Sequence, residues 1–360
     1  MVTNTPSPPL SERAHAIAAA LIAELARRPD ATDTQVAGLL ALHAAELGGL
    51  ARAAAADSAE ATVLHRVGPA MAATLLADYE ARRAAAARNG GVVGVRSGLA
   101  HLDEVLNGFE GGKLYILAAM PGAGKTTLAL QMAATVAQAG RPVLYLSLEN
   151  DATDLARKTA CRLGNVSYSA ALKGKLAPAV WQDAVRQLDQ VGGRLYLATP
   201  RATMPDIGQL VQDVTEQAGE PPALVIIDYL QALVKRAAAG ADAADVRERL
   251  DRLTPALRSL GERSGCAVLA ISSQNRAGYT GGGMASLKES GDIEYNSDVT
   301  MTLARAADKG ERGAPAGTPL LPPGVTAVCL TVEKNRQGLT GKPLWLALQG
   351  DRCQLVEIEA

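Results

Sequence analysis

Residues 114–127 read LYILAAMPGAGKTT, and this segment is the most informative about the fold. An apolar run leads into a short loop with two glycines, Gly122 and Gly124, and then into Lys125 and Thr126. Because an amphipathic segment follows, the pattern predicts a strand, a tight turn and a helix. A glycine turn at a helix N-terminus points backbone amides at phosphate oxygens. The stretch therefore predicts a P-loop.

The P-loop residues have separate expected roles. Lys125 is expected to reach the β- and γ-phosphates of ATP, and the Thr126 hydroxyl to bind magnesium. One position departs from the pattern, because Ala119 stands in place of the first glycine. The flanking strand and the helix expected at residues 127–138 count for more than this departure. The nucleotide is expected to contact Ala119, Pro121, Gly122, Ala123, Gly124, Lys125, Thr126 and Thr127.

Two further apolar runs end in carboxylates. Residues 143–149 (VLYLSLE) end in Glu149, and residues 223–228 (ALVIID) end in Asp228. Ligands of open α/β sheets bind at the carboxyl edge of the strands, so both carboxylates are expected beside the P-loop. Glu149 is placed to act as the general base for the water that attacks the γ-phosphate. Asp228 has the Walker B form and is expected to hold magnesium together with Thr126.

Apolar runs alternate with amphipathic segments from about residue 94 onward. This alternation predicts an α/β fold with a mainly parallel sheet flanked by helices. The last runs have no helices between them and are expected to form antiparallel hairpins at one edge. Pro255 is expected to break the stretch 245–263 into two helices. The strands are expected at residues 113–119, 142–148, 194–198, 223–227, 266–271, 299–303, 326–332 and 344–348.

The first part of the chain has a different pattern. Residues 1–10 are polar and proline-rich and are expected to be disordered. Residues 11–88 read as successive Ala- and Leu-rich helices. Residues 89–96 are expected to link them to an ATPase domain at 97–360. The sequence thus predicts a smaller all-α interaction region ahead of the α/β domain.

Composition limits the classes of function. The formal net charge is −1, from 36 basic and 37 acidic residues, so any DNA-binding surface must be local. The cysteines form no C-x-x-C pair and are expected to pack as small core residues. The sequence shows no apolar signal segment and no run of about 18 apolar residues. We therefore expect a cytoplasmic protein without a membrane partner. The cysteines are Cys161, Cys266, Cys329 and Cys353.

These segments together resemble the DnaB-type replicative helicases, a family of RecA-like P-loop ATPases. The resemblance covers roughly residues 94–359, and the family tolerates alanine at the first P-loop glycine. It includes the lead-in SGLAHLDEVLNG at 97–108, the SLE that ends at Glu149 and the IDYLQ at 227–231. Residues 288–294 (KESGDIE), followed by Asp298, resemble a loop–helix motif at the DNA channel. Residues 333–338 (EKNRQG) resemble the family's Lys-x-Arg pair.

The resemblance implies a homohexameric DNA helicase of replication that uses ATP and Mg2+. It implies movement 5′ to 3′ on single-stranded DNA at the replication fork of the nucleoid, with primase and a helicase loader as partners. The helix expected at 59–87 is a candidate for a linker helix that docks on the next subunit.

The resemblance also implies roles for individual residues. Arg336 would act as a trans finger on the neighbouring subunit's ATP, and Lys334 would also approach the γ-phosphate. Arg305 would flank the adenine. The implied DNA contacts are Arg276, Lys288, Glu289 and Gly291.

Three questions stay open at this point. Ser273 stands where the family usually has a glutamine that senses the γ-phosphate, and Gln274 follows it, so either residue could serve. A RecA-fold regulatory or recombination ATPase, similar to KaiC or RadA and without unwinding activity, is an alternative function. A non-motor ATPase whose N-terminal region scaffolds partners is another. The motifs at 288–294 and 333–338 favour the helicase.

Overall fold

The computed structural model describes residues 68–199, 204–237, 243–273, 296–306 and 321–358, together with Ala20, Leu21 and Arg27. The chain divides into two compact units, Met1–Leu76 and Ala77–Ala360. Apart from those three residues, the tail and helices expected ahead of residue 68 lie outside the described residues. The helix expected at 59–87 is described as α3, Pro69–Arg88.

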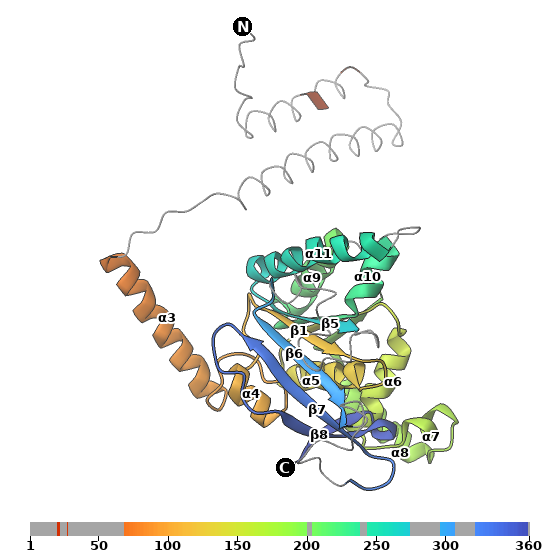
Figure 1. The fold of residues 1–360 in the computed structure, drawn as a ribbon. Helices are drawn as coiled ribbons and strands as arrows, with labels where there is room; N and C mark the ends of the chain where they lie inside the picture. The colour runs from red at the N-terminus through yellow and green to blue at the C-terminus, as the bar shows by residue number, and fades with distance from the viewer. Residues whose placement is uncertain are drawn as a thin grey trace. The chain divides into compact units, whose positions relative to one another are not determined.

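The second unit is built on one large sheet (Figure 1). Its strand order is β3-β2-β4-β5-β1-β6-β7-β8-β9, and the pairs from β3 to β6 are all parallel. The pairs from β6 to β9 are antiparallel. The mainly parallel sheet and the antiparallel edge are therefore both confirmed. The strands are β1 (Leu114–Ala119), β2 (Val143–Ser147), β3 (Leu195–Ala198), β4 (Leu224–Asp228), β5 (Ala267–Ser273), β6 (Val299–Arg305), β7 (Thr326–Asn335), β8 (Leu344–Gln349) and β9 (Gln354–Glu357).

Alternate residues of the central strands face two different layers of helices. In β1, Tyr115 and Leu117 join one buried cluster, whereas Leu114 and Ile116 join the other. Burial on both faces explains why these strands are continuously apolar, as is typical of parallel sheets. The first face carries α4 (Ala100–Leu106), α5 (Lys125–Gln138), α6 (Ala152–Leu163) and α8 (Pro178–Gly192), with α7 (Tyr168–Leu172) between α6 and α8. The second carries α9 (Met204–Ala218), α10 (Leu230–Ala237) and α11 (Ala243–Ser264).

The helix at Pro255 corrects one prediction. α11 runs from Ala243 to Ser264 with Pro255 inside it, so the expected break into two helices was wrong. Pro255 is exposed, and its ring removes one backbone hydrogen bond. Leu253 and Leu257, on either side of it, are buried in the core. Packing of this apolar face outweighs the loss of one hydrogen bond, and the helix continues.

The stretch expected as a linker, 89–96, packs against the start of the α/β unit. Val95 forms an antiparallel bridge with Phe109, and Val92 is buried. Gly94 lies so close to the Phe109 backbone that a Cβ atom would overlap it. In the described part of the chain, no helix has the length and apolarity needed to cross a membrane.

Candidate nucleotide site

The predicted P-loop joins β1 to α5 through two glycines with positive φ angles. Gly122 and Gly124 have φ angles of +79° and +95°, which residues with a Cβ rarely adopt. Gly124 is the N-cap of α5, and Lys125 is its first residue. The first amides of a helix have no partner within it, so they are available to phosphate oxygens.

Asp228 is the polar centre of the site. It is the last residue of β4 and is fully buried. The Thr126 hydroxyl donates a hydrogen bond to Asp228 Oδ2 over 2.8 Å. The Tyr145 hydroxyl donates to the same oxygen, also over 2.8 Å. The other oxygen, Oδ1, is buried and has no hydrogen-bond partner among the described residues. A buried acceptor without a partner costs free energy unless a ligand satisfies it.

These oxygens fit Mg2+. The Thr126 hydroxyl uses its hydrogen in the bond to Asp228. The lone pairs of the Thr126 oxygen therefore remain available to a metal. Asp228 Oδ1 supplies a second hard oxygen. Mg2+ usually binds one or two protein oxygens and completes its shell with phosphates and water. The described ranges contain no group of three or more His, Cys, Asp or Glu that could hold a metal. The donor set therefore suits a metal that arrives with a nucleotide.

Opposing effects act on the pKa of Asp228. Burial raises the pKa of Asp228 above its usual value, and the charge of Glu149 also acts to raise it. Hydrogen bonds from Tyr145 and Thr126 and the charge of Lys125 act to lower it. Burial also raises the pKa of Tyr145 well above its ordinary value, so its hydroxyl stays protonated and can donate. A cation beside Asp228 would therefore relieve the cost of burying its charge.

Glu149 lies beside this centre. β2 ends at Ser147, which pairs in register with Asp228. The Leu148 amide then donates to the Asp228 carbonyl over 2.8 Å. Glu149 follows at once and is exposed. It is therefore at the carboxyl edge of the sheet, where a general base could meet a water near a bound phosphate.

Arg305 reaches the P-loop of its own chain. Its Nε donates to the Gly122 carbonyl over 3.0 Å, and its Nη2 donates to the same oxygen. The register explains this contact, because Leu303 on β6 pairs with Ala119, the last residue of β1. The end of β6 therefore stands directly beside the loop.

Lys334 and Arg336 lie at the opposite end of the sheet. Lys334 pairs with Thr300 on β6, whereas the P-loop end of β1 is level with Leu303. Thr300 and Leu303 are three residues, about 10 Å, apart along β6. The P-loop continues beyond the end of β1 that is level with Leu303. Arg336 follows the end of β7 and lies further from the P-loop still, because its amide bonds to the Asp298 carbonyl just ahead of β6. Neither side chain can therefore act on a nucleotide held by the P-loop of its own chain.

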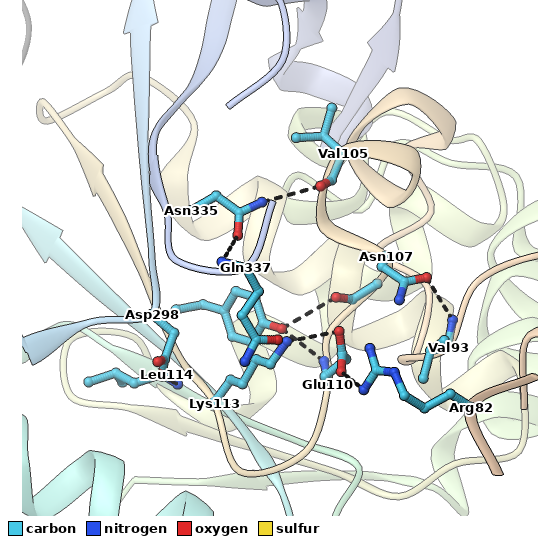
Figure 2. A network of polar contacts seen from close by, with 12 residues as sticks. Arg82, Val93, Val105, Asn107, Glu110, Lys113, Leu114, Asp298, Asn335 and Gln337 are labelled. Atoms are coloured by element: carbon cyan, nitrogen blue, oxygen red, sulfur yellow. Dashed lines mark hydrogen bonds and ion pairs between the residues drawn. The ribbon is translucent and has the colours of Figure 1, made fainter. Parts of the chain in front are cut away.

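Hydrogen bonds fix the turn that bears this pair, and Figure 2 shows those of Asn335 with Val105 and Gln337. The Lys334 ammonium donates to the Ser297 carbonyl over 2.9 Å. The Asn335 side chain donates to the carbonyls of Val105 on α4 and Leu339 in the turn, over 3.3 and 3.1 Å. Its oxygen accepts a bond from the Gln337 amide over 3.2 Å. The turn is therefore tied both to itself and to α4.

Glu110 forms a second polar centre near this turn (Figure 2). It accepts from Arg82 of α3 over 2.8 Å and pairs with Lys113 over 2.8 Å. Burial acts to raise the pKa of Glu110, but the bonds from Arg82 and Lys113 outweigh it and leave the pKa below its usual value. The Glu110 amide donates to the Tyr115 hydroxyl over 2.8 Å, which ties this centre to β1.

The structure does not describe the predicted DNA contacts or one candidate γ-phosphate sensor. Gln274, Arg276, Lys288, Glu289 and Gly291 lie outside the described residues, and their roles stay predictions.

Ser273, the other candidate γ-phosphate sensor, is described at the end of β5. Its amide donates to Gln231 Oε1 over 3.0 Å, and Gln231 Nε2 donates back to its carbonyl over 3.0 Å. Gln231 therefore holds the last residue of β5 close to the Walker B segment.

Sequence reasoning missed Tyr145, Gln231 and Asn335. Each lies inside a motif that was singled out, but none was given a role. Tyr145 had one usable signal, a phenol between the aliphatic residues Leu144 and Leu146. Gln231 and Asn335 contact groups distant in sequence, so no local pattern marks them.

Comparison with known proteins decides the family. Residues 94–350 match the family model described as the DnaB-like helicase C terminal domain. The chain belongs to this family. Among curated relatives of the DnaB-like family, the replicative DNA helicase DnaB of Geobacillus stearothermophilus is 29% identical over 227 residues, 61% of this chain and 48% of that protein. DnaB of Leifsonia xyli is 28% identical over 270 residues, 73% of this chain and 56% of that protein. The chain thus spans about half the length of these relatives.

Solved structures support the DnaB-like fold. A DnaB-like replicative helicase, described with its interactions with primase, aligns with a TM-score of 0.72 at 19% identity, covering 97% of this chain and 76% of that one. A second solved structure, described as an ATPase domain, aligns with a TM-score of 0.68 at 21% identity, covering 81% of this chain and all of that one. A KaiC-like protein from Pyrococcus horikoshii reaches only 0.50, over 74% of this chain. The KaiC-like alternative is not favoured, because residues 94–350 match the DnaB-like family model and the curated relatives above are replicative DNA helicases.

Proposed function

We propose that this chain is an ATP-dependent DNA helicase of replication that works as a ring of identical subunits, a homohexamer. One observation carries the proposal. The P-loop and Asp228 form a candidate nucleotide site within one chain. The Lys-x-Arg pair lies at the opposite end of the sheet and cannot reach that site. An arrangement of this kind is completed when the pair of one subunit faces the P-loop of the next.

The chemistry is hydrolysis of the β–γ phosphoanhydride bond. The P-loop amides and Lys125 hold the phosphates in place. Glu149 accepts a proton from a water, whose oxygen attacks the γ-phosphorus, and the bond to the bridging oxygen breaks to release ADP and phosphate. Mg2+, held through Thr126 and Asp228, would supply charge neutralisation on the phosphate oxygens.

Arg336 would stabilise the transferring phosphoryl group from the neighbouring subunit. A guanidinium offers several N–H donors in a plane and suits a trigonal phosphoryl group better than a flexible ammonium does. Lys334 would add a second positive charge. Arg305, which contacts the Gly122 carbonyl, would flank the nucleotide base from within the same chain.

Single-stranded DNA is the proposed track. Its proposed contacts are the backbone around Gly291 and the side chains of Arg276, Lys288 and Glu289, with Ser273 or Gln274 sensing the γ-phosphate. With a net charge of −1, a local basic lining must supply the phosphate contacts. We further propose that the protein acts in the cytoplasm at the fork, with primase and a loader as partners.

A forked DNA duplex tests this function. With ATP and Mg2+, the protein should displace the paired strand from a fork with a 5′ single-stranded tail, and native mass measurement should give a hexamer. The Glu149→Gln variant is the matched control and should bind the fork without unwinding it. ATP hydrolysis without strand displacement on any tailed substrate would overturn the helicase assignment and favour a non-motor ATPase.

A further inference from the structure

Tyr145 is buried at the nucleotide site but is not one of its phosphate-binding residues. It stands in the middle of β2 and is fully buried. Its neighbours Leu144 and Leu146 turn to the face of the sheet covered by α9 and α11, whereas Tyr145 turns to the face covered by α5.

The register explains how Tyr145 reaches Asp228. Tyr145 pairs with Ile226, two residues before Asp228, and both positions face α5 because side chains alternate along a strand. A diagonal neighbour on the next strand is within reach of an aromatic side chain. The phenol spans this gap and places its hydroxyl 2.8 Å from Asp228 Oδ2.

The two oxygens of Asp228 have different surroundings. Oδ2 accepts from both Thr126 and Tyr145, and Oδ1 accepts from no described residue. The terminal torsion of an aspartate is broad, so a single hydrogen bond fixes it poorly. Two donors from different elements, α5 and β2, hold Oδ2 and so determine where Oδ1 points.

We propose that Tyr145 is a positioning residue for the metal site, whose hydroxyl holds the Asp228 carboxylate so that Oδ1 faces Mg2+ or a water bound to it. The inference rests on the proposed ATPase function. Tyr145 would set the affinity for the metal without contacting the nucleotide. Residues that orient a ligand in this way typically change metal affinity by roughly 10- to 100-fold when they are replaced.

The test is Tyr145→Phe in the full chain, which removes the hydroxyl and keeps the ring. Mn2+ binding is measured by electron paramagnetic resonance in the presence of a non-hydrolysable ATP analogue. The dissociation constant for Mn2+ should rise by roughly 10- to 100-fold, while metal-free binding of the analogue stays within about twofold of the parent. High Mg2+ should then restore turnover, which a misfolded protein would not show.

Tyr115→Phe is the matched control. Tyr115 is also buried on the α5 face, but its hydroxyl donates to the Gly108 carbonyl and accepts from the Glu110 amide, away from Asp228. This variant should leave the affinity for Mn2+ unchanged.

Asp228→Asn separates the two possible failures. If Asp228→Asn weakens Mn2+ binding and Tyr145→Phe does not, the positioning role is wrong. If Asp228→Asn also binds Mn2+ normally, the metal site itself, and with it the proposed hydrolysis, is wrong.

Discussion

The Arg336 amide donates a hydrogen bond to the Asp298 carbonyl over 2.9 Å. Asp298 is fixed in turn, because its carboxylate accepts from the Leu114 amide over 2.9 Å and pairs with Arg258 over 3.2 Å. Leu114 is the first residue of β1, the strand whose other end carries the P-loop. The predicted finger is therefore attached to the sheet at the end that faces away from its own nucleotide site.

Substitutions at Lys125 and Glu149 should impair different steps, ATP binding and ATP hydrolysis respectively. Lys125→Ala should weaken ATP binding, because a cation that neutralises phosphate is lost. Glu149→Gln should bind ATP normally and lose turnover, because only the proton acceptor is removed. Equilibrium binding of a fluorescent ATP analogue, together with steady-state hydrolysis, separates the two effects. Normal hydrolysis by Glu149→Gln would remove Glu149 from the base role.

DNA binding should depend on salt through the loop around Lys288. Each phosphate neutralised on a single strand contributes about −0.7 to the slope of log affinity against log salt. Lys288→Ala and Arg276→Ala should each make that slope shallower by about this amount. Fluorescence anisotropy with a labelled oligonucleotide measures it, with the exposed Lys175→Ala as control. Parent-like slopes in both loop variants would place the DNA elsewhere.

Glu110 should stabilise the fold in a pH-dependent way. The pKa of Glu110 is lower in the folded state than in the unfolded state. Its contribution to the free energy of unfolding is therefore fully present above the unfolded-state pKa, and is lost as pH falls through the folded-state pKa. Glu110→Gln should lower the free energy of unfolding by about 1–3 kcal/mol at pH 7. The deficit should shrink below about pH 4. Urea unfolding at both pH values, with the exposed Glu104→Gln as control, measures it. A deficit independent of pH would contradict this account.

Pro255→Ala should stabilise the protein. The restored amide can donate to the carbonyl of Asp251, one helical turn earlier, and Pro255 is exposed, so no core packing is lost. Proline inside a helix costs about 3 kcal/mol relative to alanine, of which we expect about 1–3 kcal/mol to be recovered. Urea unfolding reports the change. An unchanged or lower stability would mean that α11 is already relaxed around the ring.

The strands could be predicted because each is a continuous apolar run, and parallel strands need that pattern to be buried on both faces. β9 was not expected, because it is short and begins and ends with polar residues. Its outer edge is closed by Gln131, which accepts from the Leu355 amide and donates to its carbonyl, both over 2.9 Å. The break predicted at Pro255 was wrong because helix propensity is a local property and does not include the packing of α11 against the core.

The P-loop and Asp228 were recognisable because phosphate and magnesium demand certain residues at fixed local spacing. The role of Tyr145 depends on how β2 and β4 align, which only the folded sheet specifies. The same is true of Asn335, whose contact with Val105 joins residues far apart in the chain. Local chemistry was therefore predictable, whereas contacts across the sheet were not.

Arg336 is proposed to act on the ATP of a neighbouring subunit, and ATP hydrolysis by rings assembled from two variants tests this. Arg336→Ala alone should bind ATP and lose most turnover, since such a finger is worth roughly 10³–10⁵ in rate. Lys125→Ala alone should also be inactive. When the two variants are mixed, some interfaces pair an intact P-loop with an intact Arg336, and hydrolysis should partly return. Full activity of Arg336→Ala in a monomeric protein would contradict the account.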